Sequence, residues 1–326
     1  MKETMSIEEV MPLKIKKPRP SRTKKTYKFK RAIPLFLLML PALVYLIINN
    51  YLPMLGLVIA FKDINYQKGI LGSDWVGFDN FKYLFRTKDA LIITRNTILY
   101  NLAFIILGTV VAIIVALLLN EIIKHTRKKF YQSVILLPAL ISYVIVSYLA
   151  LALLSMDVGL INNTLANFFG AAKISWYTEY KYWPYILVLV RLWKTIGLSS
   201  VIYYAAIIGI NKEYLEAAAL DGATKWQQIR HIIIPLLSHV IITLTLLDIG
   251  RIFYSDFGLF YQVPLNSGTL YPVTNVIDTY VYRGLLVLGD VGMSSAAGAY
   301  QSIVGFILVL ISNFIVRRID KERALF

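Results

Sequence analysis

Long runs of apolar residues that recur along the chain constrain this sequence more than any other feature. Six such runs lie at about residues 33–52, 97–122, 131–154, 184–208, 235–256 and 294–316. A helix of about 20 apolar residues is long enough to cross the hydrocarbon core of a bilayer. The charged fraction is only 16%, whereas a soluble domain has about 25%. We therefore predict an all-α polytopic membrane protein with six transmembrane helices.

Two other membrane architectures are excluded, and so are several kinds of chemistry. An open sheet would leave unpaired backbone groups in lipid. A transmembrane barrel would need alternating strands of about 10 residues, which these runs do not show. The chain has no cysteine, so it forms no disulfide and no thiolate metal site. Because His125, His231 and His239 are not spaced as ligands on one helical turn, we predict no metal site.

The distribution of lysine and arginine predicts the orientation of the helices. The segments on the amino-terminal side of the membrane hold 22 of the 34 such residues, and they are 1–31, 124–130, 209–234 and 317–326. The opposite loops hold only 8, although they are longer in total, and they are 62–90, 156–183 and 257–291. Since cytoplasmic loops are enriched in basic residues, we expect both termini in the cytoplasm. The net charge of +15 then reflects membrane orientation and gives no reason to expect a nucleic-acid partner.

The sequence divides into a short arm and one large domain. Residues 1–31 contain eleven basic residues, three glutamates and three prolines. We predict that they form a disordered cytoplasmic arm, which orients the chain or contacts anionic lipid. Residues 32–326 form the six-span domain. Its extracytoplasmic loop 257–291 contains a pattern at 273–288 that favours a helix lying at the membrane interface, and the aromatic residues of 176–183 suit an interfacial belt or a sugar-stacking surface.

The predicted cytoplasmic loop, 209–234, has the pattern of two short helices joined by a tight turn. Asn211 is a suitable N-cap for a first helix that ends near Leu220. Thr224 and Gln227 have the spacing of a capping box at the start of a second helix. Gly222, which lies between them, permits a left-handed turn. We therefore predict a short, rigid hairpin.

The composition of this hairpin suits contact with another protein. Ala217 and Ala218 favour helix formation and, having almost no side chain, allow a second surface to approach closely. Pro235 ends the second helix or kinks it into the fifth span. We interpret the hairpin as a docking element, and a structural elbow between two spans is the alternative.

The hairpin residues also resemble a known family signature. In binding-protein-dependent ABC importer permeases, the EAA signature reads E-A-A, three residues, G, nine residues, I-x-L-P. The matching residues have the same spacing, with isoleucine in place of the leucine, and they are Glu216, Ala217, Ala218, Gly222, Ile232, Ile234 and Pro235. Asp221, Gly222 and Ala223 have the form common in sugar permeases. Residues 50–85 and 292–326 resemble the subfamily that imports complex oligosaccharides, so the resemblance covers most of the chain.

The resemblance implies a type I ABC importer permease fold and a division of labour. In that family the hairpin is the coupling helix, which seats in a groove of a cytoplasmic ABC ATPase dimer. Glu216 would then make polar contacts, Ala217 and Ala218 would allow close seating, and Gly222 would make the turn. ATP and Mg would be used by that partner, so this chain would hold no cofactor. A second, non-identical permease would complete the path, and an extracytoplasmic solute-binding protein would deliver an oligosaccharide.

The residues independently agree with a partner that hydrolyses ATP. The chain contains no G-x-x-x-x-G-K-[ST] sequence and hence no phosphate-binding loop of its own. No nucleophile–base pair or carboxylate pair has the arrangement of a catalytic site. We therefore predict that the chain is not an enzyme, and that it is a multi-pass protein of the bacterial cytoplasmic (inner) membrane.

Polar residues within the spans are the candidates for a substrate path, because such groups usually face a cavity or each other. Asp248 and Arg251 are three residues apart in the fifth span, so they form either a structural ion pair or part of a sugar site. Tyr254 adds the aromatic ring that a sugar site requires. Trp193 and Asn101 are further candidates, with helix packing as the alternative.

We therefore interpret the chain as the transmembrane permease subunit of an ATP-driven importer for oligosaccharides, which include acidic polysaccharide fragments. An ion-gradient-driven sugar transporter is one alternative, and it would favour buried carboxylates and paired broken helices. A membrane sensor or scaffold, whose hairpin docks a signalling protein, is the other. The sequence does not identify the sugar or the partner permease.

Overall fold

The computed structural model describes residues 29–170 and 172–319, so the predicted basic arm lies almost wholly outside the described residues. The described residues divide into two units, and the boundary between the units lies between Met54 and Leu55. The first unit contains α1 (Phe29–Leu46), a π-helical turn (Ile47–Tyr51) and α2 (Leu52–Met54). Its side chains from residue 33 onward are exposed within the unit, which is the pattern of a helix whose surroundings are lipid.

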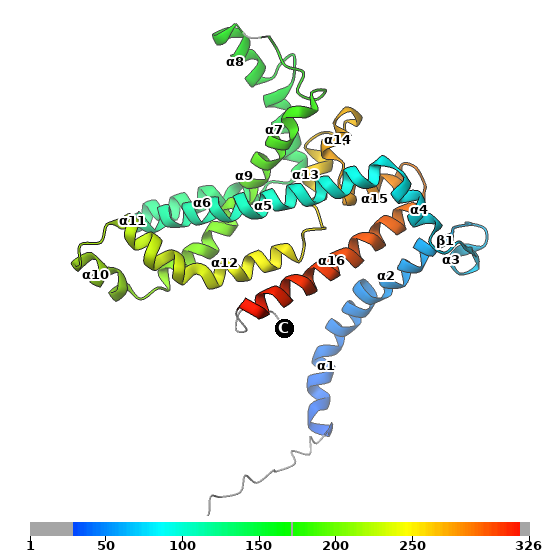
Figure 1. The fold of residues 1–326 in the computed structure, drawn as a ribbon, viewed down its shortest axis with the longest axis horizontal. Coiled ribbons are helices and arrows are strands. Elements are labelled where there is room, and N and C mark those ends of the chain that lie inside the picture. The colour runs from blue at the N-terminus through cyan, green and yellow to red at the C-terminus, as the bar shows by residue number, and fades with distance from the viewer. Residues whose placement is uncertain (1–28, 171, 320–326) are drawn as a thin grey trace, which may run out of the picture. The chain divides into compact units, whose positions relative to one another are not determined.

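Long apolar helices dominate the described chain (Figure 1), and the predicted class, an all-α polytopic membrane protein, is confirmed. Five helical stretches are long and apolar enough to cross a membrane, namely Ile33–Phe61, Lys88–Glu121, Tyr180–Ile208, Lys225–Ile249 and Val291–Arg318. The predicted third span is instead a pair of helices, α6 (His125–Leu140) and α7 (Tyr143–Leu154), bent by 97°. The described chain therefore has six spans if that bent pair is one of them.

The second unit is built around four of these stretches. Its long helices are α5 (Lys88–Glu121), α9 (Trp183–Ile208), α12 (Ile234–Ile249) and α16 (Val291–Ile319). Buried residues of α5, α9, α12 and the π-helical turn before α12 (Ile229–Ile233) share one apolar cluster, comprising Ala112, Ala116, Tyr203, Ile207, Ile233 and Leu237. Small residues let these helices approach closely, which is the usual basis of helix packing in membranes.

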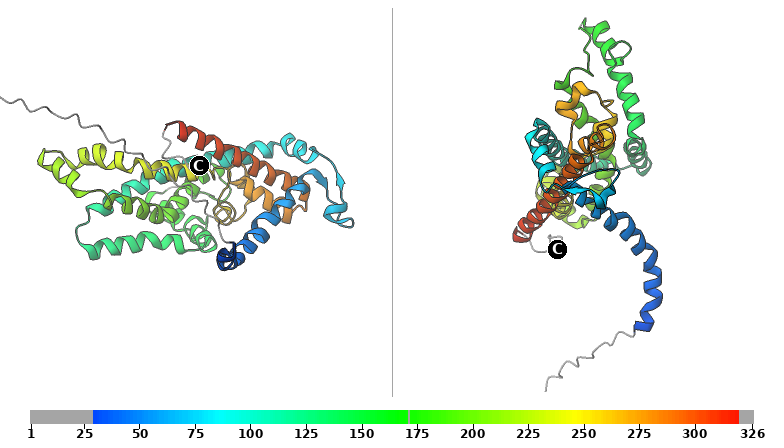
Figure 2. Two further views of the ribbon diagram at one scale, coloured as in Figure 1. Left: turned by 90° about the horizontal axis from the view of Figure 1, so that it is seen from below. Right: turned by 90° about the vertical axis from the view of Figure 1, so that its right-hand side faces the viewer.

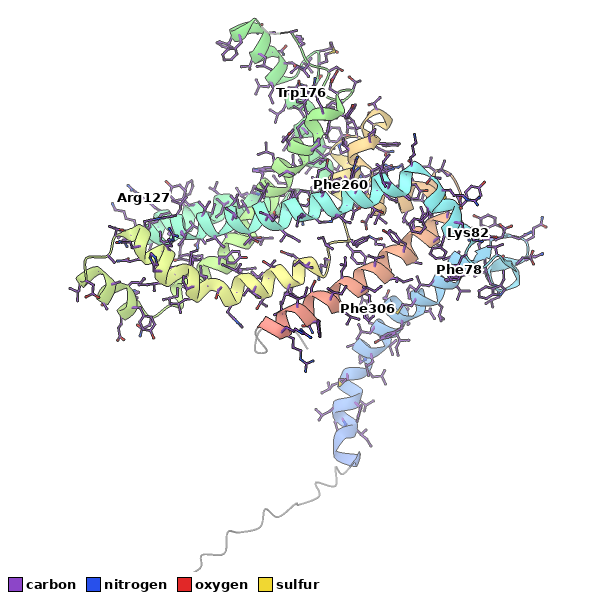
Figure 3. All side chains as sticks on the ribbon, in the orientation of Figure 1. Phe78, Lys82, Arg127, Trp176, Phe260 and Phe306 are labelled. Atoms are coloured by element: carbon purple, nitrogen blue, oxygen red, sulfur yellow. The ribbon has the colours of Figure 1, made fainter. Side chains whose placement is uncertain are left out.

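Shorter elements connect the long helices. They are a 3₁₀ segment (Leu55–Phe61), β1 (Lys62–Asp63), α3 (Gly69–Gly72), β2 (Asp74–Trp75), α4 (Asp79–Arg86), α8 (Leu160–Phe169), α10 (Lys212–Leu220), α11 (Lys225–Gln228), α13 (Phe257–Gln262), α14 (Tyr271–Thr274) and α15 (Ile277–Leu286). β1 and β2 form a two-stranded antiparallel pair, with Lys62 opposite Trp75. In Figure 2, the α10–α11 pair lies at one end of the second unit and the β1–β2 pair lies at the other. Figure 3 labels Arg127 at the first end and Phe78 and Lys82 at the second.

The bend between α6 and α7 is held by a lysine from α9. Lys194 donates from Nζ to the carbonyl oxygens of Pro138, at 3.1 Å, and Ile141, at the end of α6, where the regular intrahelical hydrogen bonds stop. The Pro138 carbonyl also accepts from the amide of Ile141 at 3.3 Å. Ser142 then caps α7 by accepting from the amide of Ile145. The sharp bend is therefore possible at this position without leaving these backbone groups unpaired in an apolar setting.

The helix predicted within the loop 257–291 is present as α15. Its apolar face packs inside the protein, because Ile277 is fully buried and Tyr280 is nearly so in a cluster with residues of α5 and α16. In the preceding loop, Trp183 is also fully buried, and its Nε1 donates to the carbonyl oxygen of Trp176. Trp183 thus contributes to the core and is not an exposed ring of an aromatic belt or of a sugar-stacking surface.

Candidate functional site

The predicted cytoplasmic loop folds as the hairpin that its sequence indicates. Asn211 caps α10 by accepting, through Oδ1, a hydrogen bond from the amide of Glu213 at 3.1 Å. Thr224 begins α11 with a reciprocal capping box, in which its Oγ1 accepts from the Gln227 amide and its own amide donates to Gln227 Oε1. Both caps satisfy donors that a helix start leaves unpaired. Local side chains therefore set where both helices begin.

The turn between α10 and α11 depends on one glycine. Gly222 has φ of +82°, which is the left-handed conformation. Its amide donates to the carbonyl oxygen of Ala219, and the next amide, of Ala223, donates back to Ala218 at 2.9 Å. This pair of hydrogen bonds is a Schellman motif, which closes the end of a helix. The hairpin thus has one preferred geometry, set by residues 218–223.

The outer surface of the hairpin is open. Glu216, Ala217 and Asp221 are exposed, and no residue of α10 is buried. Large apolar side chains are exposed beside them, since Leu220 is 90% and Trp226 is 68% exposed. Our sequence analysis did not single out these two residues, although apolar side chains in an otherwise polar loop were the available signal. An exposed apolar surface of this kind on a preformed element is typical of a protein interface.

The inner side of the hairpin is fixed to the bundle. Leu215 of α10 and Ile229 after α11 pack against the apolar cluster shared by α5, α9 and α12. Pro235 does not end the second helix, because a π-helical turn (Ile229–Ile233) continues directly into α12. Proline has no backbone N–H to donate, and a π-helical turn lets the helix continue although that hydrogen bond is missing. The hairpin and α12 therefore form one connected lever.

A cavity of about 630 Å³ lies among α5, α9 and α12, where α12 ends and residues 250–256 leave the helix. Of the sequence-predicted path residues, four line it, namely Asn101, Asp248, Arg251 and Tyr254. Trp193 does not line it and instead lies on an exposed part of α9. Arg191, Thr195 and Ser199 of α9 add polar groups to the wall.

One predicted path residue holds the backbone in place. Asn101 donates from Nδ2 to the carbonyl oxygens of Ile252, at 2.9 Å, and Tyr254, at 3.3 Å. These carbonyls belong to the segment that has left the helix, so they have no intrahelical partner. Asn101 is therefore a positioning residue for the broken segment, and its amide donors are already in use.

Two further residues, from α15 and α16, hold the same segment from the other side. Gln301 of α16 donates to the carbonyl oxygen of Phe253 at 2.6 Å. Asp278 of α15 accepts from the amide of Ser255 at 2.8 Å and from Gln301 at 3.1 Å. Burial raises the pKa of the Asp278 carboxyl, although these hydrogen bonds oppose the shift. Helices α5, α15 and α16 thus fix the path of residues 252–255.

The ion pair at the cavity differs from the predicted one. Arg191 Nη1 lies 2.6 Å from Asp256 Oδ2, and the hydroxyl of Tyr143 donates to the same oxygen at 2.7 Å. Asp248 and Arg251 do not form the ion pair that their spacing predicted, although each lines the cavity. Since α12 ends at Ile249, Arg251 is no longer on the helical face that the spacing assumes. Arg251 is left as a cation without a carboxylate within ion-pair distance among the described residues.

The described residues contain no group of three or more histidine, aspartate and glutamate side chains that could hold a metal ion. What the geometry offers is a polar cavity within an apolar bundle, and a preformed hairpin on the lever that leads to it. Such a cavity lined by charged and aromatic groups is suited to binding and passing a polar solute. The fold and the two sites together define a membrane transport subunit.

The comparison with known families identifies this subunit more closely. The chain belongs to the family of binding-protein-dependent transport system inner membrane components, whose sequence profile matches residues 108–321. It is therefore a multi-pass component of the inner membrane. This finding confirms the family that the EAA residues suggested.

Individual relatives agree with this assignment. The chain is 36% identical over 288 residues, 88% of this chain and 89% of the relative, to the polygalacturonan/rhamnogalacturonan transport system permease protein YteP of Bacillus subtilis (strain 168). It is also similar to a chain of the crystal structure of a bacterial ABC transporter involved in the import of the acidic polysaccharide alginate, with a TM-score of 0.82, 32% identity and coverage of 90% of this chain and 98% of that chain. A chain in the crystal structure of a bacterial alginate ABC transporter, in complex with an alginate pentasaccharide-bound periplasmic protein, has a TM-score of 0.81 and 32% identity, with coverage of 90% of this chain and 97% of that chain.

Proposed function

We propose that this chain is the permease subunit of an ATP-driven importer for oligosaccharides that carry carboxylate groups. The observation that carries the proposal is the lever, in which an exposed preformed hairpin is continuous with the helix that ends at a polar cavity. The similarity to permeases named for polygalacturonan and alginate, two acidic polysaccharides, supports the substrate class.

The hairpin is the part that docks on a separate ATPase and moves with it. Ala217 and Ala218 allow a partner surface to approach the backbone, and Leu220 and Trp226 offer apolar contacts beside them. Glu216 and Asp221 provide charged groups at the edge of this surface. ATP and Mg are used by the ATPase dimer, and the permease converts the movement of the ATPases into movement of α12.

The cavity is the part that contacts the sugar. Arg251 is the cation best placed to bind a carboxylate, because Arg191 is neutralised by Asp256 at 2.6 Å. Tyr254 lines the same wall and is 48% exposed, so its ring is free to stack on the apolar face of a sugar. Asp248, which also lines the cavity, is suited to accept hydrogen bonds from sugar hydroxyls.

Other subunits complete the importer. A second, non-identical permease forms the other wall of the path, and an extracytoplasmic solute-binding protein delivers the oligosaccharide. The alginate transporter provides a precedent for such delivery, since its structure includes a periplasmic protein loaded with a pentasaccharide.

Reconstitution of the importer tests this proposal. The chain is co-purified with its partner subunits, placed in proteoliposomes, and supplied with its binding protein and either a uronate oligosaccharide or its neutral methyl ester. We expect ATP-dependent uptake, and we expect Arg251→Gln to lower uptake of the acidic sugar by about tenfold or more, since a hydrogen bond to a charged group contributes about 1.5–3 kcal/mol. Uptake of the neutral ester should change less.

A matched control separates charge in the cavity from charge elsewhere. Arg317→Gln makes the same change at an exposed position near the end of α16, outside the cavity wall, and it should leave uptake unchanged. Uptake that follows a proton or sodium gradient without ATP would refute the ATP-driven mechanism. A complex that assembles but never moves sugar would indicate a sensor or scaffold.

A further inference from the structure

A second cavity, of about 670 Å³, lies between the hairpin and the ends of the spans that surround it. Its walls come from the end of α5, the start of α6, the end of α9, and α10 with α11. Two of these spans end at Glu121 and Ile208, and a third begins at Lys225. The cavity is therefore at the depth where a bilayer changes from hydrocarbon to headgroups.

The cavity wall carries three lysines from three different helices. They are Lys128 of α6, Lys212 of α10 and Lys225 of α11. Lys128 Nζ lies 5.2 Å from the ring centroid of Tyr204, which is also part of the wall, so its charge is held at the cavity. Lys225 lies 3.5 Å from Glu121, and Lys212 forms no ion pair with a described carboxylate.

The net charge of the cavity wall is positive even when its glutamates are included. Glu216 lines the cavity, and Glu121 pairs with Lys225, so three lysines face two glutamates. Further basic residues, Lys124, Arg127 and Lys129, lie in the adjoining segment of the chain and strengthen the positive potential at this level. A ligand for this cavity should therefore be an anion.

The rest of the wall is apolar, which a soluble anion would not require. Ile122, Ile207, Ile208 and Ile210 line it together with Ile123. Ile123 follows the end of α5 and is 96% exposed, although it is one of the most apolar side chains. An exposed isoleucine beside lysines at the end of a span fits a molecule with a charged head and an acyl chain.

We propose that this cavity binds an anionic phospholipid. The phosphate of the lipid contacts Lys128 and Lys212, and an acyl chain lies along Ile122 and Ile123. Basic pockets between the ends of transmembrane helices recognise anionic headgroups in this way. Because Lys212 and Leu215 belong to α10, the bound lipid braces the hairpin against the bundle. Activity of the importer should then depend on the anionic lipid content of the membrane.

Native mass spectrometry of the importer, co-purified with its partner subunits, tests the binding. We expect phosphatidylglycerol or cardiolipin to stay bound to the wild-type complex. In Lys128→Gln with Lys212→Gln, retention should fall about fivefold for each lysine, because a basic residue near an anionic lipid surface contributes about 1 kcal/mol. Lys88→Gln is the matched control, since Lys88 is exposed at the start of α5, at the opposite end of that helix from the cavity. Equal retention by all variants would overturn the proposal.

A crosslinking experiment keeps the proposal testable if the double variant assembles poorly. The chain has no cysteine, so Ile123→Cys gives a single site in this subunit for a photoreactive label. Capture of phosphatidylglycerol in nanodiscs supports the lipid site, whereas capture of the ATPase subunit in place of lipid would overturn it.

The lipid source is distinguished by the composition of the nanodiscs. ATPase activity stimulated by the binding protein should be higher in discs that contain phosphatidylglycerol than in discs of phosphatidylcholine alone. Inorganic phosphate added to the phosphatidylcholine discs should not restore that activity. Restoration by phosphate would show that a soluble anion, and not a lipid, occupies the cavity.

Discussion

Replacing Gly222 isolates the contribution of the turn to coupling. An ideal Cβ at Gly222 would meet no atom within 4 Å, so the methyl group of alanine fits there without a clash. The penalty comes only from φ of +82°, which costs an L-residue about 1–2 kcal/mol. If the ATPase binds only the observed hairpin, Gly222→Ala should weaken that docking by about 5- to 30-fold.

The size of the effect should follow the backbone preference of the new residue. Gly222→Asn should lose least, because asparagine tolerates the left-handed region, and Gly222→Val should lose most, because β-branched residues avoid it. The measurement is ATPase activity stimulated by the binding protein in proteoliposomes, normalised to the amount of assembled complex. A volume effect would give a different order, since asparagine is larger than alanine.

Gly209→Ala is the control for this series. Gly209 follows the last residue of α9 and has φ of −77°. The atom nearest to a Cβ added at Gly209 would be the carbonyl oxygen of Ala206, at 3.4 Å. This substitution needs no change of conformation, so coupling should be retained. If Gly222→Ala retains coupling as well as Gly209→Ala does, the left-handed turn does not set the docking geometry, and the reasoning fails.

Two further predictions concern the bundle. A Cβ added at Gly197 would clash with the carbonyl oxygen of Ile135, whereas one added at Gly108 would meet nothing within 4 Å. Gly197→Ala should therefore reduce the free energy of unfolding by about 1–3 kcal/mol and lower the melting temperature of the purified complex. Gly108→Ala should leave the melting temperature unchanged. Asn101→Ala should speed amide hydrogen exchange in residues 252–255, because two carbonyl oxygens lose their donor. Combining it with Gln301→Ala should change exchange non-additively, since both residues hold one segment, and unchanged exchange in either variant would contradict that role.

The hairpin was predictable from sequence because its signals are local. Asn211, Thr224 with Gln227, and Gly222 each act on backbone groups within a few residues, so their spacing alone specifies the caps and the turn. The bend between α6 and α7 was not predictable in this way. Its decisive partner, Lys194, lies 53 residues from Ile141, and no local pattern indicates that contact.

The ion-pair partners at the cavity were also not predictable from local sequence. The spacing of Asp248 and Arg251 predicts a pair only if the helix continues through both residues, and the helix ends between them. The observed partner of Arg191 is Asp256, which is 65 residues away. Residue type thus indicated that charged groups would meet in this region, but which ones pair depends on packing between helices.

The point where α12 ends determines how a movement of the hairpin would reach the cavity. α12 runs from Ile234 to Ile249, so it carries a displacement of the hairpin over about 24 Å at 1.5 Å per residue. At its far end the chain is no longer helical, but Asn101 and Gln301 tie its carbonyls to α5 and α16. The non-helical segment that follows α12 is therefore not free to take up a movement of the hairpin by itself. It must either carry α5 and α16 along or exchange those hydrogen bonds for others, and both outcomes change the shape of the cavity that Arg251 lines.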